Sequence, residues 1–87
     1  MSNVLIVEDD EVIGKSMASH LAAAGFEPTW VPNGVAGLAR LRYERPDVCV
    51  VDLMLPALDG WELIETARGH GIGTPVIVVS ARGSEQD

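Results

Sequence analysis

The sequence predicts an α/β fold, a doubly wound parallel sheet with helices on both faces. Short apolar runs rich in β-branched residues alternate with segments whose apolar residues recur at helical spacing, which gives the element order β-α-β-α-β-α-β. Most of the apolar runs lack the polar alternation of a half-exposed strand, and this is typical of a parallel sheet covered on both faces. A chain of 87 residues is long enough for one small domain at most.

The first strand and the first helix are predicted at the start of the chain. The run VLIV at 4–7 predicts a buried strand. A helix is predicted over 11–24, with Asp10 as its N-cap and Gly25 ending it. The apolar residues that recur at helical spacing in this segment are Ile13, Met17, Leu21 and Ala24.

The second strand and helix follow. The segment EPTWV at 27–31 predicts a strand, and Pro28 within it favours an edge of the sheet because proline cannot donate a ladder hydrogen bond. Asn33 and Gly34 open the next helix. The apolar residues expected on one face of that helix are Val35, Leu38 and Leu41.

The remaining elements are two strands and the helix between them. The run VCVVDL at 48–53 predicts a central strand buried on both faces. A helix is predicted over 59–68, where Asp59 and Glu62 have the spacing of a capping box. The run PVIVVS at 75–80 predicts a fourth strand, also buried on both faces.

Composition excludes several classes of protein. The chain has 13 acidic and 6 basic residues, a formal net charge of −7, which argues against direct binding to nucleic acid. Its single cysteine, Cys49, lies in an apolar run, so we interpret it as a core residue, and no disulfide within the chain is possible. We find no secretory signal and no run long enough to cross a bilayer. We therefore expect a cytoplasmic protein without membrane association.

Acidic side chains end two of the predicted strands. Glu8 and Asp9 follow the first strand, and Asp52 ends the third. In an open parallel sheet, ligands bind outside the carboxyl ends of the strands, so these three carboxylates converge if the two strands are neighbours. Such a cluster is typical of a Mg²⁺ site. Each feature alone could be a solvated turn or a helix cap, but together they favour the metal. Ser80 ends the fourth strand and could place a hydroxyl at the same edge.

Three segments extend this interpretation. VLIVEDDE, VVDLMLPALDGWEL and PVIVVSA resemble, in order and spacing, the signature segments of the response-regulator receiver domain of two-component signalling. The resemblance covers all 87 residues, and the middle segment is the most specific. It implies a flavodoxin-like sheet with strand order 2-1-3-4 for the strands present.

The resemblance also implies roles for individual residues. Asp52 would be the phospho-acceptor, and Mg²⁺ would be held by Glu8, Asp9, Asp52 and the backbone carbonyl of Met54. Ser80 would sense the phosphoryl group, and the small Ala81 after it would leave room for that group. The phosphodonor would be a histidine kinase or a phosphotransfer protein.

The sequence departs from the family pattern after the fourth strand. A receiver domain continues with a fourth helix, a fifth strand that ends in a lysine, and a fifth helix. The only lysine here is Lys15, in the first helix, and it does not match that position. We therefore expect residues 1–87 to be the N-terminal part of a receiver domain without an effector domain. The segment is either a fragment of a longer transcriptional regulator, which we favour, or a natural remnant of one. Self-association through the fourth-strand edge or an uncovered sheet face is a further expectation.

Two alternatives to a phospho-accepting signalling module stay open. The first is an interaction domain of the same fold that is not phosphorylated, which the missing lysine favours and the intact acids disfavour. The second is a phosphatase with an aspartyl-phosphate intermediate. That chemistry needs an aspartate two residues after the nucleophile, where this chain has Met54, so we expect the chain not to be an enzyme.

Overall fold

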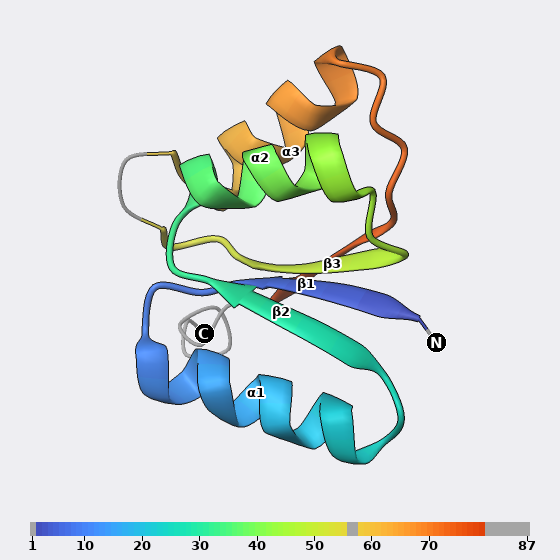
Figure 1. Ribbon diagram of the computed structural model, residues 1–87. Helices are drawn as coiled ribbons and strands as arrows, with labels where there is room; N and C mark the ends of the chain where they lie inside the picture. Colours follow the sequence, from blue (N-terminus) through green and yellow to red (C-terminus); the bar gives the residue numbers. More distant parts are fainter. Residues whose placement is uncertain (1, 56–57, 80–87) are drawn as a thin grey trace.

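The computed structural model describes residues 2–55 and 58–79. It contains a parallel sheet in the order β2-β1-β3-β4, with helices in the crossovers (Figure 1). The elements are β1 (Asn3–Val7), α1 (Glu11–Ala23), β2 (Glu27–Val31), α2 (Gly34–Glu44), β3 (Val48–Asp52), α3 (Gly60–Gly69) and β4 (Val76–Val79). The predicted α/β class and the strand order 2-1-3-4 are confirmed. Pro28 lies in β2 at an edge of the sheet, as predicted.

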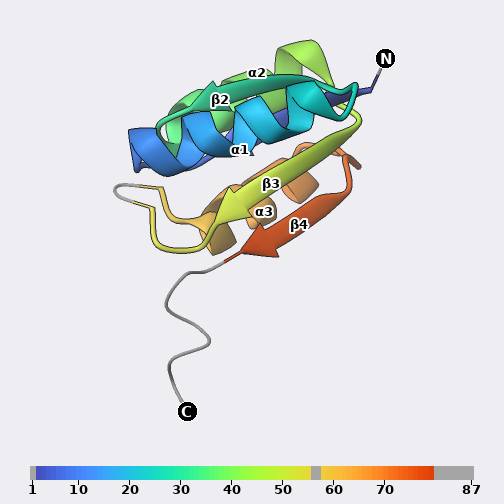
Figure 2. The same ribbon diagram turned by 90° about the horizontal axis from the view of Figure 1, so that it is seen from below.

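The helices lie on opposite faces of the sheet. α2 and α3 lie on one face, and α1 lies on the other, where it packs against β2 and β1 (Figures 1 and 2). The main core lies between the sheet and the α2/α3 layer; its buried members are Leu5, Val7, Val31, Leu41, Cys49, Val51, Leu55, Leu63, Ala67 and Ile72. Cys49 belongs to this core, and burial raises the pKa of its thiol to about 12, so the thiol stays neutral.

The predicted helix ends are confirmed by hydrogen bonds. The side chain of Asp10 accepts from the Ile13 amide at 3.1 Å, and that of Asn33 caps α2 in the same way. Asp59 and Glu62 form the predicted capping box at the start of α3. At Gly25 the backbone turns left-handed, with φ of 97°, which a residue with a side chain rarely adopts. None of the helices in these two described ranges is long and apolar enough to cross a membrane.

Several predictions of burial were wrong. Val35 is 63% exposed, because the buried residues of α2 are Gly34, Gly37 and Leu41 instead. Gly37 lies against Val7 of β1, and Gly34 lies against Leu58. Ile13, one of the apolar residues at helical spacing in α1, is 44% exposed. Glycine carries no hydrophobic signal, yet it lets a helix approach the sheet closely, so the apolar pattern did not reveal these contacts.

The third and fourth strands are not buried on both faces, as the sequence predicted. In β3 only Cys49 and Val51 are fully buried, and in β4 Ile77 is 54% and Val78 38% exposed. On the side of Ile77, the reason is that α1 packs against β2 and β1, and among the described residues no helix covers that face over β3 and β4 (Figure 2). Val78 pairs with Val51 and lies on the α2/α3 side, on the outermost strand of the described sheet. The predicted strand 75–80 is described only as Val76–Val79.

Candidate metal centre

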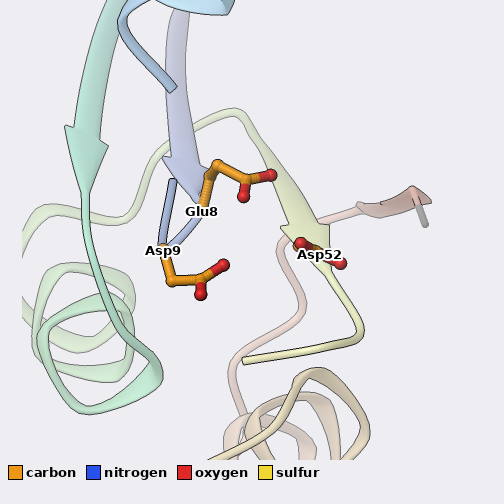
Figure 3. A group of neighbouring side chains, drawn as sticks. All are labelled: Glu8, Asp9 and Asp52. Carbon is orange, nitrogen blue, oxygen red and sulfur yellow. The ribbon is translucent and has the colours of Figure 1, made fainter. Parts of the chain in front are cut away.

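Three carboxylates meet at the carboxyl edge of the two central strands. β1 and β3 are neighbours, and Val7 pairs with Val51, so the next residues, Glu8 and Asp52, lie level with each other. Asp9 follows Glu8 in the turn that leads to α1. One carboxylate oxygen from each of the three acids lies within 4.8 Å of the others (Figure 3). The convergence that was expected from the strand ends is therefore present.

Hydrogen bonds hold the acidic turn on the β1 side. The Glu8 amide donates to the Val31 carbonyl at 3.1 Å, and the Glu8 carbonyl accepts from the indole nitrogen of Trp30 at 2.8 Å. The Glu8 carboxylate accepts from the Asp10 amide at 3.1 Å. Sequence reasoning missed Trp30, because a contact between residues 22 positions apart leaves no periodic or motif signal.

The β3 side of the site is held by the segment that follows Asp52. The Met54 amide donates to Oδ1 of Asp52 at 3.0 Å, which orients that carboxylate. The Gly60 amide donates to the Leu53 carbonyl at 3.3 Å. A Cβ at Gly60 would lie 2.8 Å from the Asp52 carbonyl oxygen, so only glycine lets the start of α3 sit this close to the end of β3.

The electrostatics of the cluster favour a cation. Glu8 is only 6% exposed, and burial raises the pKa of its carboxyl group. The Asp10 amide opposes this shift, while the negative charges of Asp52 and Asp9 add to it. Asp9 is exposed and Asp52 is partly buried, so the cluster opens to solvent on one side. A divalent ion would relieve the repulsion, and an all-oxygen set of donors fits a hard cation such as Mg²⁺.

A hollow in the surface adjoins the cluster. Its lining residues are Asp9, Leu53, Met54, Leu55 and Asp59. Met54 therefore lies at the site, next to Asp52. The backbone carbonyl of Met54 as a metal ligand stays a prediction. Ser80 and Ala81, the two other predicted site residues, lie outside the described residues.

Comparison with known proteins identifies the family. A family model described as the response regulator receiver domain matches residues 4–87. The chain belongs to this family. It is therefore a receiver domain of two-component signalling, and the resemblance carried by VLIVEDDE, VVDLMLPALDGWEL and PVIVVSA is confirmed.

Relatives of this receiver domain include whole regulatory proteins. It is 42% identical over 86 residues to the transcriptional regulatory protein CseB of Streptomyces coelicolor, which is 99% of this chain and 36% of that protein. It is 41% identical over 87 residues to the sensory transduction protein RegX3 of Mycobacterium tuberculosis, covering 38% of that protein. The chain thus spans little more than a third of the length of these relatives.

Solved receiver domains share the fold. The receiver domain of the Francisella response regulator 1452 superposes with a TM-score of 0.91 at 32% identity, over 99% of this chain and 71% of that chain. The BeF3-activated N-terminal receiver domain of Klebsiella pneumoniae RstA gives a TM-score of 0.83 at 29% identity, over 91% of this chain and 67% of that chain. These matches support the flavodoxin-like arrangement of the described strands and helices.

Proposed function

We propose that Asp52 of this receiver domain accepts a phosphoryl group from a partner histidine kinase or phosphotransfer protein, with Mg²⁺ bound at the acidic cluster. The observation that carries the proposal is the convergence of Glu8, Asp9 and Asp52 at the carboxyl edge of neighbouring strands. Membership of the receiver family supports it. The ion would be held by these three carboxylates and by the backbone carbonyl of Met54.

The chemistry asked of Asp52 is nucleophilic attack. A carboxylate oxygen forms a bond to phosphorus, the phosphorus–nitrogen bond of the donor phosphohistidine breaks, and its electron pair returns to the imidazole, which takes up a proton from solvent. Bound Mg²⁺ would supply charge neutralisation between the carboxylates and the incoming phosphoryl oxygens. The Met54 amide holds Oδ1 of Asp52 and so fixes the orientation of the nucleophile. Ser80 would then donate its hydroxyl to the phosphoryl group, with room left by Ala81.

The proposal extends to the setting of the domain. Residues 1–87 would form the N-terminal part of a receiver domain that belongs to a longer cytoplasmic transcriptional regulator. The segment would act as a signalling module rather than as an enzyme, and its net charge of −7 disfavours direct contact with nucleic acid. Met54 stands where an aspartyl-phosphate phosphatase needs its acid/base aspartate, which disfavours that alternative.

The phospho-acceptor is tested by intact mass. The chain is incubated with Mg²⁺ and a small-molecule phosphodonor such as acetyl phosphate, and the adduct of one phosphoryl group is measured. Asp52→Asn should abolish the adduct. Asp47→Asn is the matched control, because Asp47 precedes β3 and so lies at the end of the strand opposite to Asp52. Asparagine at this position can still accept from the Asn3 amide. An equal adduct in Asp52→Asn would disprove the assignment, and no adduct in the parent would favour an unphosphorylated interaction domain.

Metal binding is tested separately by calorimetry. Asp9→Asn should lose most of the Mg²⁺ affinity, because it removes a ligand carboxylate at the open side of the cluster. Asp10→Asn is the control next to it, since asparagine caps a helix as well as aspartate does. Equal losses in the two variants would point to general attraction by an acidic surface rather than to a site.

We also propose that the 87-residue chain on its own self-associates through β4 or the sheet face beside it. β4 is the outermost strand of the described sheet, and Ile77 and Val78 on it are exposed. An apolar edge strand is a template for pairing with another chain. Sedimentation at several concentrations should show association that Ile77→Lys weakens. A sedimentation coefficient that does not change on dilution would refute it.

A further inference from the structure

Trp30 is the side chain that ties the edge strand β2 to the acidic turn. Its indole nitrogen donates to the Glu8 carbonyl at 2.8 Å, at the peptide bond that joins Glu8 to Asp9. The other end of Glu8 is held as well, because its amide donates to Val31, the residue after Trp30. Two successive residues of β2 thus fix both peptide groups of the residue whose carboxylate lies deepest in the cluster.

A glycine of α1 leaves the space that the Trp30 ring occupies. Gly14 is buried, and a Cβ at this position would overlap the indole ring. The amide of Gly14 donates to the carbonyl of Asp10, the residue that caps the helix and ends the acidic turn. The partly buried indole therefore packs against the first turns of α1, and its nitrogen donates to a carbonyl oxygen of the acidic turn.

We infer that Trp30 is a positioning residue for the metal centre: its indole N–H fixes the Glu8–Asp9 peptide and thereby the direction of the two carboxylates. This inference rests on the proposed metal site. A peptide plane that is free to rotate would let the Asp9 side chain swing into solvent, whereas a plane held by Trp30 keeps it beside Glu8 and Asp52. Residues that orient ligands in this way tune metal affinity without contacting the ion.

A role in packing alone predicts different behaviour. Trp30 also fills the space between α1 and β2, and Lys15 lies over its ring with the nitrogen 6.0 Å from the ring centroid. If packing were its whole role, a ring of similar shape without the N–H would serve equally well. The hydrogen bond and the ring must therefore be separated by experiment.

The first experiment compares Trp30→Phe with Trp61→Phe, which changes an exposed tryptophan of α3 in the same way. We expect Trp30→Phe to weaken Mg²⁺ binding about tenfold by calorimetry, and Trp61→Phe to leave it unchanged. Because phenylalanine also alters the packing, a second variant replaces Trp30 with benzothienylalanine, in which sulfur takes the place of the N–H and the ring shape is kept, in a Trp61→Phe background. It should show the same loss. Parental affinity in this isosteric variant would overturn the inference.

A metal-free measurement keeps the inference separate from the proposed function. Amide hydrogen exchange is followed in EDTA at Glu8, whose amide donates to the Val31 carbonyl of β2, and at Asp10, whose amide donates to the Glu8 carboxylate. The reference position is Ala36, whose amide is bonded to the cap of α2. Loss of the indole N–H should speed exchange several-fold at Glu8 and Asp10 and leave Ala36 unchanged. Should the parent bind no Mg²⁺, the proposed metal site fails, and this comparison still decides the role of Trp30. Unchanged exchange at Glu8 and Asp10 would overturn it.

Discussion

The face of the sheet that carries α2 and α3 is buried more completely than the face that carries α1. On the α2/α3 side, Cys49 and Val51 of β3 have no exposed surface, and Leu63 of α3 is 1% exposed. On the α1 side, β1 is well covered, but Val50 of β3 is only partly buried and Ile77 of β4 is 54% exposed. Side chains alternate along a strand, so in β3 these differences separate the two faces of one strand. In β4 the contrast is weaker, because Val78 on the α2/α3 side is also 38% exposed.

The alternation also assigns the site to one face. Glu8, Trp30 and Asp52 each follow or precede a residue of the α2/α3 core, so their side chains point toward the α1 side. The α2/α3 side therefore holds the main core, while the α1 side holds the acidic cluster of the candidate site. A change of charge at these carboxylates therefore takes place on the opposite side of the sheet from the main core.

Truncating one leucine on each side of the sheet should give the largest difference in stability between the two faces. Leu63→Ala removes a fully buried side chain of α3 and should lower the free energy of unfolding by about 3 kcal/mol. Leu21→Ala makes the same change in α1, where the side chain is only partly buried, and should cost less than half as much. Urea unfolding monitored by circular dichroism measures both. Equal losses would show that the two faces contribute alike.

The thiol of Cys49 gives an independent readout of the same core. Burial holds it neutral, with a pKa of about 12, so thiol reagents reach it only when the α2/α3 side opens. Leu63→Ala should speed labelling of Cys49 far more than Leu21→Ala does. Rapid labelling in the unmodified chain would show that this core opens without global unfolding.

A finer comparison uses two neighbouring valines of β3. Val51→Ala should cost about 2 kcal/mol, since two methyl groups leave a fully buried position. Val50→Ala changes the next residue, which faces the α1 side and is only partly buried, and should cost clearly less. Thermal unfolding of the two variants measures the difference. A larger loss for Val50 would reverse the ranking of the faces.

The smallest effect on stability is expected at Glu8, whose protonation depends on pH. The folded-state pKa of Glu8 lies above its ordinary value of 4.5, so the folded state binds this proton more tightly than the unfolded state. The resulting stabilisation is present below the ordinary pKa and is lost as pH rises through the raised one. In EDTA, Glu8→Gln should therefore become increasingly more stable than the parent over that interval, by less than the loss in Val51→Ala.

Mg²⁺ supplies the control for this titration. Added ion should stabilise the parent more than Glu8→Gln, because the parent offers the extra carboxylate. The stability advantage of Glu8→Gln over the parent in EDTA should then shrink or reverse. A stability difference between Glu8→Gln and the parent that depends on neither pH nor Mg²⁺ would mean that folding does not raise the pKa of Glu8.

Much of the fold was predictable because its signals are local. The run at 4–7 and the caps at Asp10 and Asp59 each act through neighbouring residues, so the sequence displays them directly. Burial was less predictable, since it depends on what covers a residue. Val35 and Ile77 are both apolar, yet Val35 lies away from the buried face of α2, and among the described residues no helix covers Ile77.

At the candidate site, too, some features could be predicted from the sequence and others could not. The convergence of Glu8, Asp9 and Asp52 followed from strand ends and neighbouring strands, a rule that needs only the topology. The support from Trp30 could not be derived, because it depends on the register of β2 against β1 and on the missing side chain of Gly14. Contacts that exist only after packing leave no mark in the pattern of one chain.

The strand order carries a consequence for the synthesis of the protein. β1 lies in the middle of the sheet, and Val4 pairs with Val48, so roughly 40 residues must be translated between the two partners. At ribosomal rates of about 5–20 residues per second, the β3-facing edge of β1 waits for seconds before its neighbour exists. During that time VLIV is an apolar strand with an open edge, and nascent chains on one message are crowded together. A ribosome that pauses within α2 would lengthen this window and favour contact between chains over folding within one.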